Sequence, residues 1–545
     1  DEESIVNLPN WLPFTFRPAG GHWFAPHTVH RLHEHQLLDL RGGVYRRECL
    51  VVDGWQRRTR LRQRRLVSMA DAHLAALETT IIPENWSGRL EVRSALDGDV
   101  VNSNTAASTG IGGRHLTDVR TGTDGPETVW MTAETTHSRQ RVAFAARTRS
   151  SVAARRRTVA GPMEIGHELH AGLGPGGRLT VEKTVAVYTS RDRAVYEPLV
   201  NARQAVAWAG SFETLLREHE AAWRRLWSSF RLDVGAMHPW QLPVRVHLFH
   251  LLQTLSPHSA DLDAGVPARG LHGEGYQGNT FWDELIVFGF LNLRLPELSR
   301  ALLSYRHRRL GQARRQAAEL GLPGARYPWQ SGSSGRDESP PESRNPRTGA
   351  CVPDHTGRQH HVNLALAYAV WRYWEATEDL TFLATYGLDM LVEAARFWAA
   401  LATYDPASDR YDIRGVIGPD EFHDGYPDRP GEGVDNCAYV NVLTAWVLGR
   451  ACDAQTLVRQ RHGALVEQDV RADDEELARW DHIRRRLRVP FLDNGVIAQF
   501  EGYGDLAELD WAGYRARYGD LGNLAAILQA EGDSANRYRV SKQAD

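Results

Sequence analysis

Residues 298–317 read LSRALLSYRHRRLGQARRQA, and the spacing of the apolar side chains predicts a helix. These side chains follow one stripe with the period of an α-helix: Leu298, Leu302, Tyr305, Leu310, Ala313 and Ala317. A second stripe runs through Leu391, Ala395, Trp398 and Ala402. Residues 360–376 and 438–452 are apolar around most of their circumference, which is typical of helices buried between neighbours. Long Gly- and Pro-rich loops join these segments, so residues 239–545 are predicted to form an α-helical barrel with a site built by its loops.

The first 195 residues have a different period. Leu90, Val92, Ser94 and Leu96 alternate with polar neighbours, and Asp97-Gly98 supplies a hairpin turn signal. The same period of two recurs in residues 142–146 and in residues 179–187, where Lys183 interrupts the apolar face. Many short alternating runs separated by turn residues predict a large antiparallel β-sandwich over residues 1–195. Between the two parts, residues 196–238 are predicted to form a helical linker.

The composition is that of a globular protein: of 545 residues, 42% are hydrophobic and 24% are charged. The formal charge of −4 gives no electrostatic reason to expect nucleic acid or an anionic membrane as a partner. Four cysteines lie far apart without a CxxC spacing, which suggests neither a disulfide framework nor a zinc site and fits the cytoplasm. No run of 18 apolar residues occurs, and the first 30 residues do not resemble a signal peptide. The chain opens with DEESIVNLPNW, without a methionine, so we expect the native N-terminus to lie upstream.

Glu421 lies in the sequence Gly418-Pro419-Asp420-Glu421, between two helical patterns, and is a candidate proton donor to a glycosidic oxygen. A carboxylic acid that donates a proton near neutral pH needs a raised pKa, which burial beside apolar groups can provide. The alternative is a loop glutamate in solvent, or one that caps a helix.

The pair Trp282-Asp283 ends the glycine-rich stretch LHGEGYQGNTFWD of residues 271–283. A flat indole face stacks on the C–H face of a pyranose, and the neighbouring carboxylate can accept two hydroxyl hydrogen bonds. The alternative is a buried tryptophan followed by an aspartate that caps a helix N-terminus. Together with Glu421, the pair indicates carbohydrate chemistry.

Other motifs do not indicate a cofactor or a metal. Residues 273–278 match GxGxxG, but no predicted strand precedes them, so we interpret them as a tight turn near a ligand and not as a dinucleotide site. Asp354, His355, His360 and His361 match no closed zinc spacing, and His361 is expected to begin a helix. The arginines at 155–157 and 306–315 are expected to form solvated faces. Lys542 and Gln543, taken alone, indicate only a polar tail.

As a set, these segments resemble glycoside hydrolase family 65 in order and spacing. The matching segments are HGEGYQGNTFWDEL, YRHRRLGQARRQAAELGLPGARYPWQSG, EAARFWA, GPDEFHD, DNCAYVN, FEGY and SKQAD, with NLPNW, SMADAHL and PENWSGRLEVRSALDG in the first part. The family holds maltose, trehalose and kojibiose phosphorylases and some hydrolases.

The resemblance implies an N-terminal β-supersandwich, a helical linker and an (α/α)6 barrel. It implies that Glu421 is the general acid, that the pairs Trp282-Asp283 and Lys542-Gln543 hold the non-reducing glucose, and that Trp329 lines the same pocket. The chain departs from the family where DNNAYTN reads Asp435-Asn436-Cys437-Ala438-Tyr439-Val440-Asn441, which puts the usual disaccharide preference in doubt. In the family, further barrel helices, a phosphate-gripping segment and a C-terminal β domain follow the SKQAD position.

The resemblance thus implies an inverting α-glucoside phosphorylase with inorganic phosphate as co-substrate and β-glucose 1-phosphate as product. The alternative is an inverting hydrolase, which needs a second carboxylate about 6.5–9.5 Å from the acid as a base for water. That base, or the phosphate-binding residues, would follow residue 545. A third hypothesis is that the protein is a homologue that binds carbohydrate and does not turn it over. Family members commonly dimerise, so a homodimer is an expectation from the resemblance alone.

Overall fold

The computed structural model describes residues 3–25, 27–103, 113–232, 235, 239–270, 275–462 and 472–542. The chain divides into two compact units. Val6–Ala106 and Ile111–Ser256 make one, which we call the β unit. Pro257–Asp545, with Asp1–Ile5 and Ala107–Gly110, make the other, which we call the helical unit. The order of sheets followed by helices confirms the predicted fold class, whereas the predicted domain limits stay a prediction.

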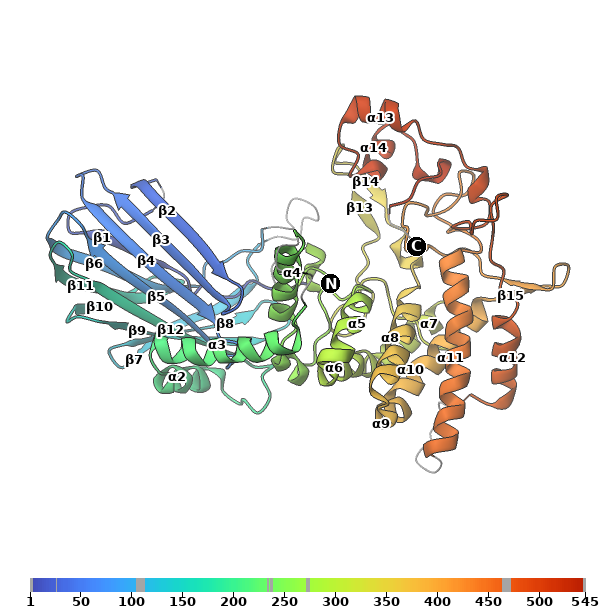
Figure 1. Cartoon of the computed structure of the whole chain (residues 1–545), viewed down its shortest axis with the longest axis horizontal. Helices are drawn as coiled ribbons and strands as arrows, with labels where there is room; N and C mark the ends of the chain where they lie inside the picture. The colour runs from blue at the N-terminus through green and yellow to red at the C-terminus, as the bar shows by residue number, and fades with distance from the viewer. Residues whose placement is uncertain are drawn as a thin grey trace. The chain divides into compact units, whose positions relative to one another are not determined.

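Two antiparallel sheets make up the described strands of the β unit (Figure 1). The smaller has the order β1 (Phe14–Pro18), β6 (Gly88–Asp97), β11 (Glu164–Leu173) and β10 (Arg155–Ala160). The larger has the order β2 (His30–Asp39), β3 (Val44–Val52), β4 (Arg58–Val67), β5 (Leu74–Pro83), β12 (Leu179–Thr189), β9 (Arg141–Ser150), β8 (Thr128–Thr135) and β7 (Leu116–Asp124). The chain therefore crosses from one sheet to the other, since consecutive strands such as β5 and β6 lie in different sheets.

The central strands of the larger sheet, such as β9 and β12, are buried on both faces. Residues such as Val51, Leu61 and Val181 pack between the two sheets with Val92 and Leu169 of the smaller sheet. On the other face, side chains of β9 and β12 pack against α2 (Pro198–Trp208) and the start of α3 (Phe212–Ser229), and α4 (Gln241–Thr254) completes the unit. Burial on both faces explains why β9 reads as an almost continuous apolar run and not as a simple alternation.

The predicted hairpin at Asp97-Gly98 is wrong. β6 ends at Asp97, but its partners are β1 and β11, and the next strand, β7, lies in the other sheet. A turn signal in the sequence marks the end of a strand, whereas the partner of that strand is chosen by long-range packing.

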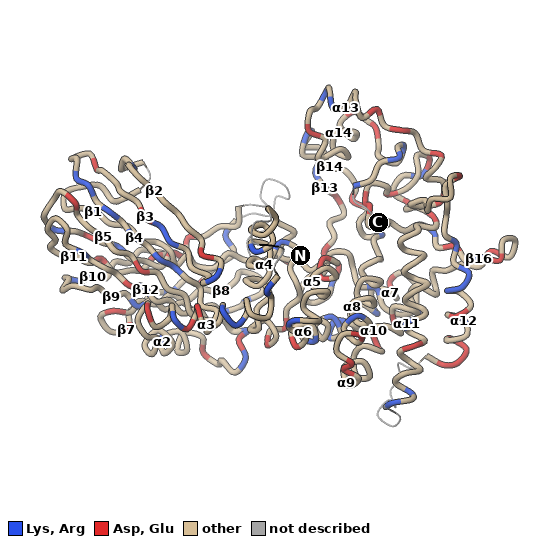
Figure 2. The backbone as a smooth tube through the Cα atoms, in the orientation of Figure 1, with Lys and Arg blue, Asp and Glu red and all other residues tan. Residues whose placement is uncertain are grey.

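Charged side chains on the strands are largely paired. Arginines and acidic residues are interspersed along β3, β4 and β5 (Figure 2). Arg60 pairs with Glu48 and Glu84, and Arg64 pairs with Glu78. Such partly exposed pairs contribute little stability each, but they neutralise a strand that is rich in arginine.

Lys183 of β12 is an exception, because its side chain is buried between the sheets. Its Nζ donates hydrogen bonds to the backbone carbonyls of Ala95 (2.5 Å) and Pro13 (3.4 Å) in the smaller sheet. Burial lowers the pKa of the Lys183 ammonium from its ordinary 10.5 to about 7. Lys183, which interrupts the apolar face in the sequence, thus joins the two sheets by hydrogen bonds.

The helical unit consists of helices in two layers joined by long loops. Its helices are α5 (Glu284–Arg294), α6 (Pro296–Arg308), α7 (Leu310–Glu319), α8 (Val362–Thr377), α9 (Leu380–Phe382), α10 (Leu388–Leu401), α11 (Ala438–His462), α12 (Asp474–Arg484), α13 (Trp511–Tyr518) and α14 (Leu524–Ala530). Short strands form two ladders, β13 (Glu342–Arg344) with β14 (Cys351–Pro353) and β15 (Thr403–Asp405) with β16 (Arg410–Asp412).

Along the chain, six of these helices (α5, α6, α8, α10, α11 and α12) alternate between the layers. α8 contacts both α5 and α11, whereas α6 packs on α5 and α8, α10 on α8 and α11, and α12 on α10 and α11. This alternation is what an (α/α) architecture requires (Figure 1). In the described ranges, no helix combines the length and the apolar character that crossing a bilayer requires.

The buried ammonium of Lys183 predicts a pH dependence of folding. Between pH 7 and 10.5 the unfolded chain holds a proton on this lysine that the folded protein does not, so the free energy of unfolding rises with pH in this window. The rise is about 1.4 kcal/mol per pH unit. Urea unfolding at pH 7.5, 8.5 and 9.5 should show this component in the wild type and not in Lys183→Met. Equal slopes for the two proteins would contradict the prediction.

Candidate active site

An aromatic cluster surrounds His361 at the start of α8. The Trp282 ring lies edge to face with His361, with 4.8 Å between ring centroids, and the Trp329 ring lies 5.1 Å away. Tyr439 of α11 lies 6.2 Å from both Trp282 and His361. The structure therefore brings together Trp282, which a sequence motif singled out, and Trp329, which the resemblance implied, around His361 and Tyr439.

His361 is fully buried, and burial lowers its pKa to about 3, so the ring is neutral at physiological pH. Neither ring nitrogen makes a hydrogen bond of good geometry within the described part of the chain, although the Ile417 backbone lies against the imidazole. Ile417 directly precedes the Gly418–Glu421 turn. His361 therefore connects the tryptophans to the loop that carries Glu421.

A buried ion pair fixes the backbone under Trp282. Arg306 Nε lies 2.7 Å from Glu284 Oε1, both side chains are at most 5% exposed, and Arg306 also donates to the Phe281 carbonyl (2.9 Å). Burial raises the pKa of the Glu284 carboxyl, which the Arg306 guanidinium counteracts. The prediction that Arg306 belongs to a solvated face is wrong, because the residue lies on the inner side of α6 and supports the segment before α5.

Asp283 stands at the N-cap position of α5, but its carboxylate makes no capping hydrogen bond. The capping alternative for this residue is therefore not what the structure shows. Partial desolvation raises the pKa of Asp283, and the nearby Arg269 counteracts the shift. Its carboxylate remains open to accept hydrogen bonds from a ligand.

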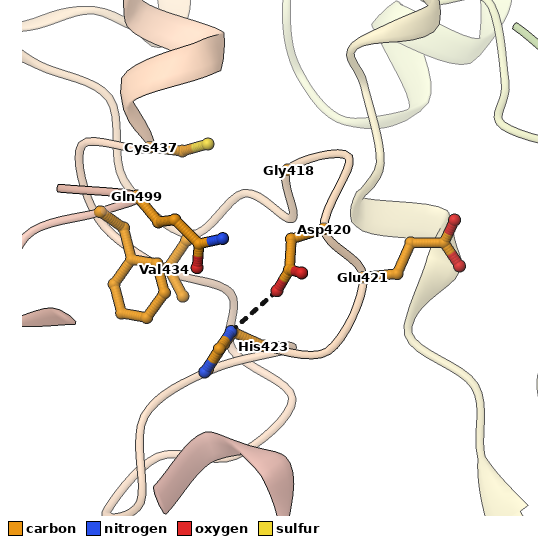
Figure 3. Close-up of a pocket in the computed structure, with 8 residues that line it drawn as sticks. Gly418, Asp420, Glu421, His423, Val434, Cys437 and Gln499 are labelled. Carbon is orange, nitrogen blue, oxygen red and sulfur yellow. Dashed lines mark hydrogen bonds and ion pairs between the residues drawn. The ribbon is translucent and has the colours of Figure 1, made fainter. Parts of the chain in front are cut away.

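Glu421 has a left-handed backbone, with φ of 62°, in the turn that Gly418 begins. Figure 3 shows the consequence: the side chains of Asp420 and Glu421 leave the turn on opposite sides. The Glu421 carboxylate pairs with Lys542, whose Nζ lies 2.6 Å from Oε2. Glu421 and Lys542 are 121 residues apart in the chain, and the family resemblance implied a role in the site for both.

A small cavity lies beside this turn (Figure 3). Its lining residues are Gly418, Asp420, Glu421, His423, Val434, Cys437, Gln499 and Phe500, and the Glu421 carboxylate points away from the other labelled side chains. Trp282 and Asp283 do not line this cavity, and no ion pair or hydrogen bond among the described residues joins Asp283 to Glu421. The link between the two halves of the site runs through His361 and Tyr439.

The remaining predicted site residues are placed as follows. His355 Nδ1 lies 2.8 Å from Asp424 Oδ2, and Arg326 Nε donates to His360 Nδ1 at 3.2 Å, so each of these histidines has a protein partner. Gln543 lies outside the described residues.

Sequence reasoning placed His361 at the start of a helix without a role in the site, and it missed His423 and Tyr439, because isolated polar or aromatic residues carry no spacing signal. It also passed over a composition signal: Lys183 and Lys542 are the only lysines in the sequence. Since 62 of the 64 cationic residues are arginines, the rare lysine at position 542 was a signal that this position has a specific role.

Comparison with known proteins identifies the family. Residues 1–226 match the N-terminal domain of glycosyl hydrolase family 65, and residues 245–545 match its central catalytic domain. The chain belongs to this family of enzymes, which are of the glycoside phosphorylase and hydrolase type.

Several relatives give context. An uncharacterised glycosyl hydrolase of Mycobacterium tuberculosis is 45% identical over all of this chain, which spans 41% of that protein. A kojibiose phosphorylase of Halothermothrix orenii is 32% identical over 99% of this chain and 69% of its own length. A trehalose 6-phosphate phosphorylase of Lactococcus lactis is 38% identical over 59% of this chain and 41% of its own length. The chain thus spans about two fifths to two thirds of these relatives.

The fold is also found in a solved structure. A protein described as "Putative kojibiose phosphorylase from human microbiome" superposes with a TM-score of 0.80 at 18% identity, over 99% of this chain and 67% of that one. At this identity the likeness concerns the fold, and it agrees with the β-supersandwich and helical region described above.

The neutral His361 predicts acid lability. Below pH 6.5 the unfolded chain binds a proton on this residue that the folded protein does not bind until about pH 3, so stability falls as pH falls through this window. The loss is about 1.4 kcal/mol per pH unit. His361→Phe keeps an aromatic ring and should reduce the slope of unfolding free energy against pH, measured by urea unfolding at pH 7, 6 and 5. An unchanged slope would show that the ring is not held neutral.

Proposed function

We propose that the protein catalyses inverting phosphorolysis of an α-linked glucosyl disaccharide, with Glu421 as the proton donor. Glu421 gives its proton to the interglycosidic oxygen while an oxygen of inorganic phosphate attacks the anomeric carbon from the opposite face. The bond between that carbon and the interglycosidic oxygen breaks, which gives β-glucose 1-phosphate and the free acceptor sugar. Phosphate is itself the nucleophile, so one carboxyl group suffices, and no metal or organic cofactor takes part.

One observation carries this proposal: the Glu421 carboxylate leaves its turn on the side away from Asp420 and is paired at 2.6 Å with Lys542, while the tryptophan cluster adjoins the same loop through His361. A partly buried carboxyl group on a loop that adjoins an aromatic cluster suits proton donation to a glycosidic oxygen. The relatives named as kojibiose and trehalose 6-phosphate phosphorylases support a glucoside and phosphate as substrates.

The other residues of the site bind the donor glucose in this proposal. Trp282 presents its face to the pyranose, and the open carboxylate of Asp283 accepts hydroxyl hydrogen bonds. Trp329 lies 6.2 Å from Trp282 and extends the same aromatic surface. Lys542 and Gln543 hold the non-reducing hydroxyl groups.

Lys542 Nζ lies 2.6 Å from Glu421 Oε2, so the lysine is in direct contact with the proposed acid. In this proposal, a hydroxyl group of the donor glucose accepts a hydrogen bond from Lys542 in place of Glu421.

The proposal predicts that Glu421→Gln lowers kcat by roughly 10²–10⁴-fold, because the amide keeps the shape of the side chain and cannot donate the proton. The assay incubates the protein, at its natural length, with α-linked diglucosides of different linkage and inorganic phosphate. Phosphorus NMR then detects β-glucose 1-phosphate and distinguishes it from the α anomer.

Glu432→Gln is the matched control, since Glu432 is an exposed glutamate of the same loop. It should behave as the wild type. Glucose release without consumption of phosphate would replace phosphorolysis with hydrolysis, and full activity of Glu421→Gln would remove Glu421 from its assigned role.

A further inference from the structure

Residues 536–542, which we call the Lys542 arm, lie against the turn that carries Glu421. Beyond the pairing of Lys542 with Glu421, three side chains of the turn or its continuation reach the arm: Asp420, His423 and Asp424. Figure 3 shows the side chains of Asp420 and His423 on the side of the turn opposite to Glu421.

Asp420 makes the central contact. The Lys542 backbone N–H donates to Asp420 Oδ1 at 2.6 Å, and Oδ2 lies 3.0 Å from His423 Nδ1. The carboxylate is 5% exposed, so these are its partners in a site where water cannot easily replace them. The hydrogen bond is to the backbone of Lys542, and it therefore sets the position of the residue and not only of its flexible side chain.

His423 extends the contact to the middle of the arm. It is 3% exposed, and its Nε2 donates to the Tyr538 carbonyl at 2.9 Å. The two ring nitrogens thus face oxygen atoms on both sides, the Asp420 carboxylate and the Tyr538 carbonyl. The aromatic rings of Phe500 and Tyr503 pack on the imidazole and hold its orientation.

Two further contacts lie on either side of this pair. Asn536 Nδ2 donates to Asp424 Oδ1 at 2.6 Å, and Gln499 Nε2 donates to Ser541 Oγ at 3.2 Å. The opposite edge of the arm pairs with Ala507, whose N–H donates to the Arg537 carbonyl. The arm is therefore held along its length, but Asp420 is the contact next to Lys542.

We propose that Asp420 and His423 are positioning residues that hold the Lys542 arm so that the Lys542 ammonium meets Glu421. The placement of Lys542 rests on geometry alone, whereas its effect on turnover rests on the function proposed above. Asp420 and Glu421 are adjacent on a turn with a left-handed residue, so their side chains point to different sides. Asp420 holds the arm in place, and Glu421 faces the ammonium group of Lys542.

Lysine labelling tests the placement without substrate. Lys183 is buried in the β unit, so Lys542 is the accessible lysine of the described chain and reacts with an amine-selective acylating reagent at a rate that mass spectrometry of its peptide can follow. Asp420→Ala should raise the labelling rate of Lys542 several-fold, because the arm loses the hydrogen bond beside it. His423→Phe, which keeps a ring without hydrogen bonds, should raise it as well.

Asp420→Asn provides the conservative rescue. Its amide oxygen can still accept from the Lys542 N–H, and its NH₂ group can donate to a neutral His423 ring, so its labelling rate should lie near that of the wild type. Asp389→Ala is the matched control, because Asp389 forms a similar pair with His307 (3.0 Å) that does not touch the arm. Labelling of Lys542 at the wild-type rate in Asp420→Ala, or an equal rise in Asp389→Ala, would overturn the proposal.

Kinetics test the consequence in the full-length protein. Asp420→Ala should raise KM for the disaccharide about tenfold, the effect of a lost hydrogen bond to a charged group. Combined with Lys542→Met it should add little to the effect of Lys542→Met alone, because both changes remove the same contact. Fully additive effects would show that Asp420 does not act through Lys542.

The two proposals fail separately. A wild type without phosphorolysis would refute the proposed function and leave the labelling result intact. An active wild type whose Asp420→Ala variant matches it in labelling and KM would refute the positioning role alone.

Discussion

The left-handed backbone at Glu421 is the constraint on which the arrangement of the site depends. A non-glycine residue in this conformation costs about 1–2 kcal/mol, so the surroundings must hold it there. Hydrogen bonds that join the Lys542 arm to Asp420 and His423 supply that support from a segment more than a hundred residues away. In return, the turn separates adjacent side chains: Asp420 points toward His423 on the side of the cavity, and Glu421 points away from them and pairs with Lys542.

The tryptophan side of the site is organised differently, by packing and not by hydrogen bonds. Trp282, Trp329 and Tyr439 come from three separate segments and meet around a histidine whose charge is suppressed by burial. A neutral imidazole suits this role, since an uncompensated charge among aromatic rings would be costly to bury. The aromatic cluster and the hydrogen-bonded turn meet at Ile417. The affinity for a ligand that contacts both would therefore depend on the position of each.

Local sequence signals predicted what depends on local structure. Periodicity found strands such as β6, β9 and β12 and the helices α6, α8, α10 and α11, and local motifs singled out Glu421 and Trp282, whereas Trp329 came from the family resemblance. Partners of strands were not predictable in this way, as β6 shows, because hydrogen bonds between distant strands leave no trace in a short window. The same holds for Asp420, His423 and His361, whose importance comes from contacts across the fold. Arg306 was misjudged because a run of arginines on a helix hides the one that faces inward.

The pair formed by Glu284 and Arg306 limits how this sequence can drift. Loss of either partner leaves an unpaired charge in a place that water does not reach, and this destabilises the fold. Replacement of both partners by apolar groups of similar volume costs much less stability. The two positions are therefore expected to covary among homologues. A lineage that replaced the two residues one at a time would pass through an intermediate sequence of lower stability. The loss of stability would affect the backbone beneath Trp282 first.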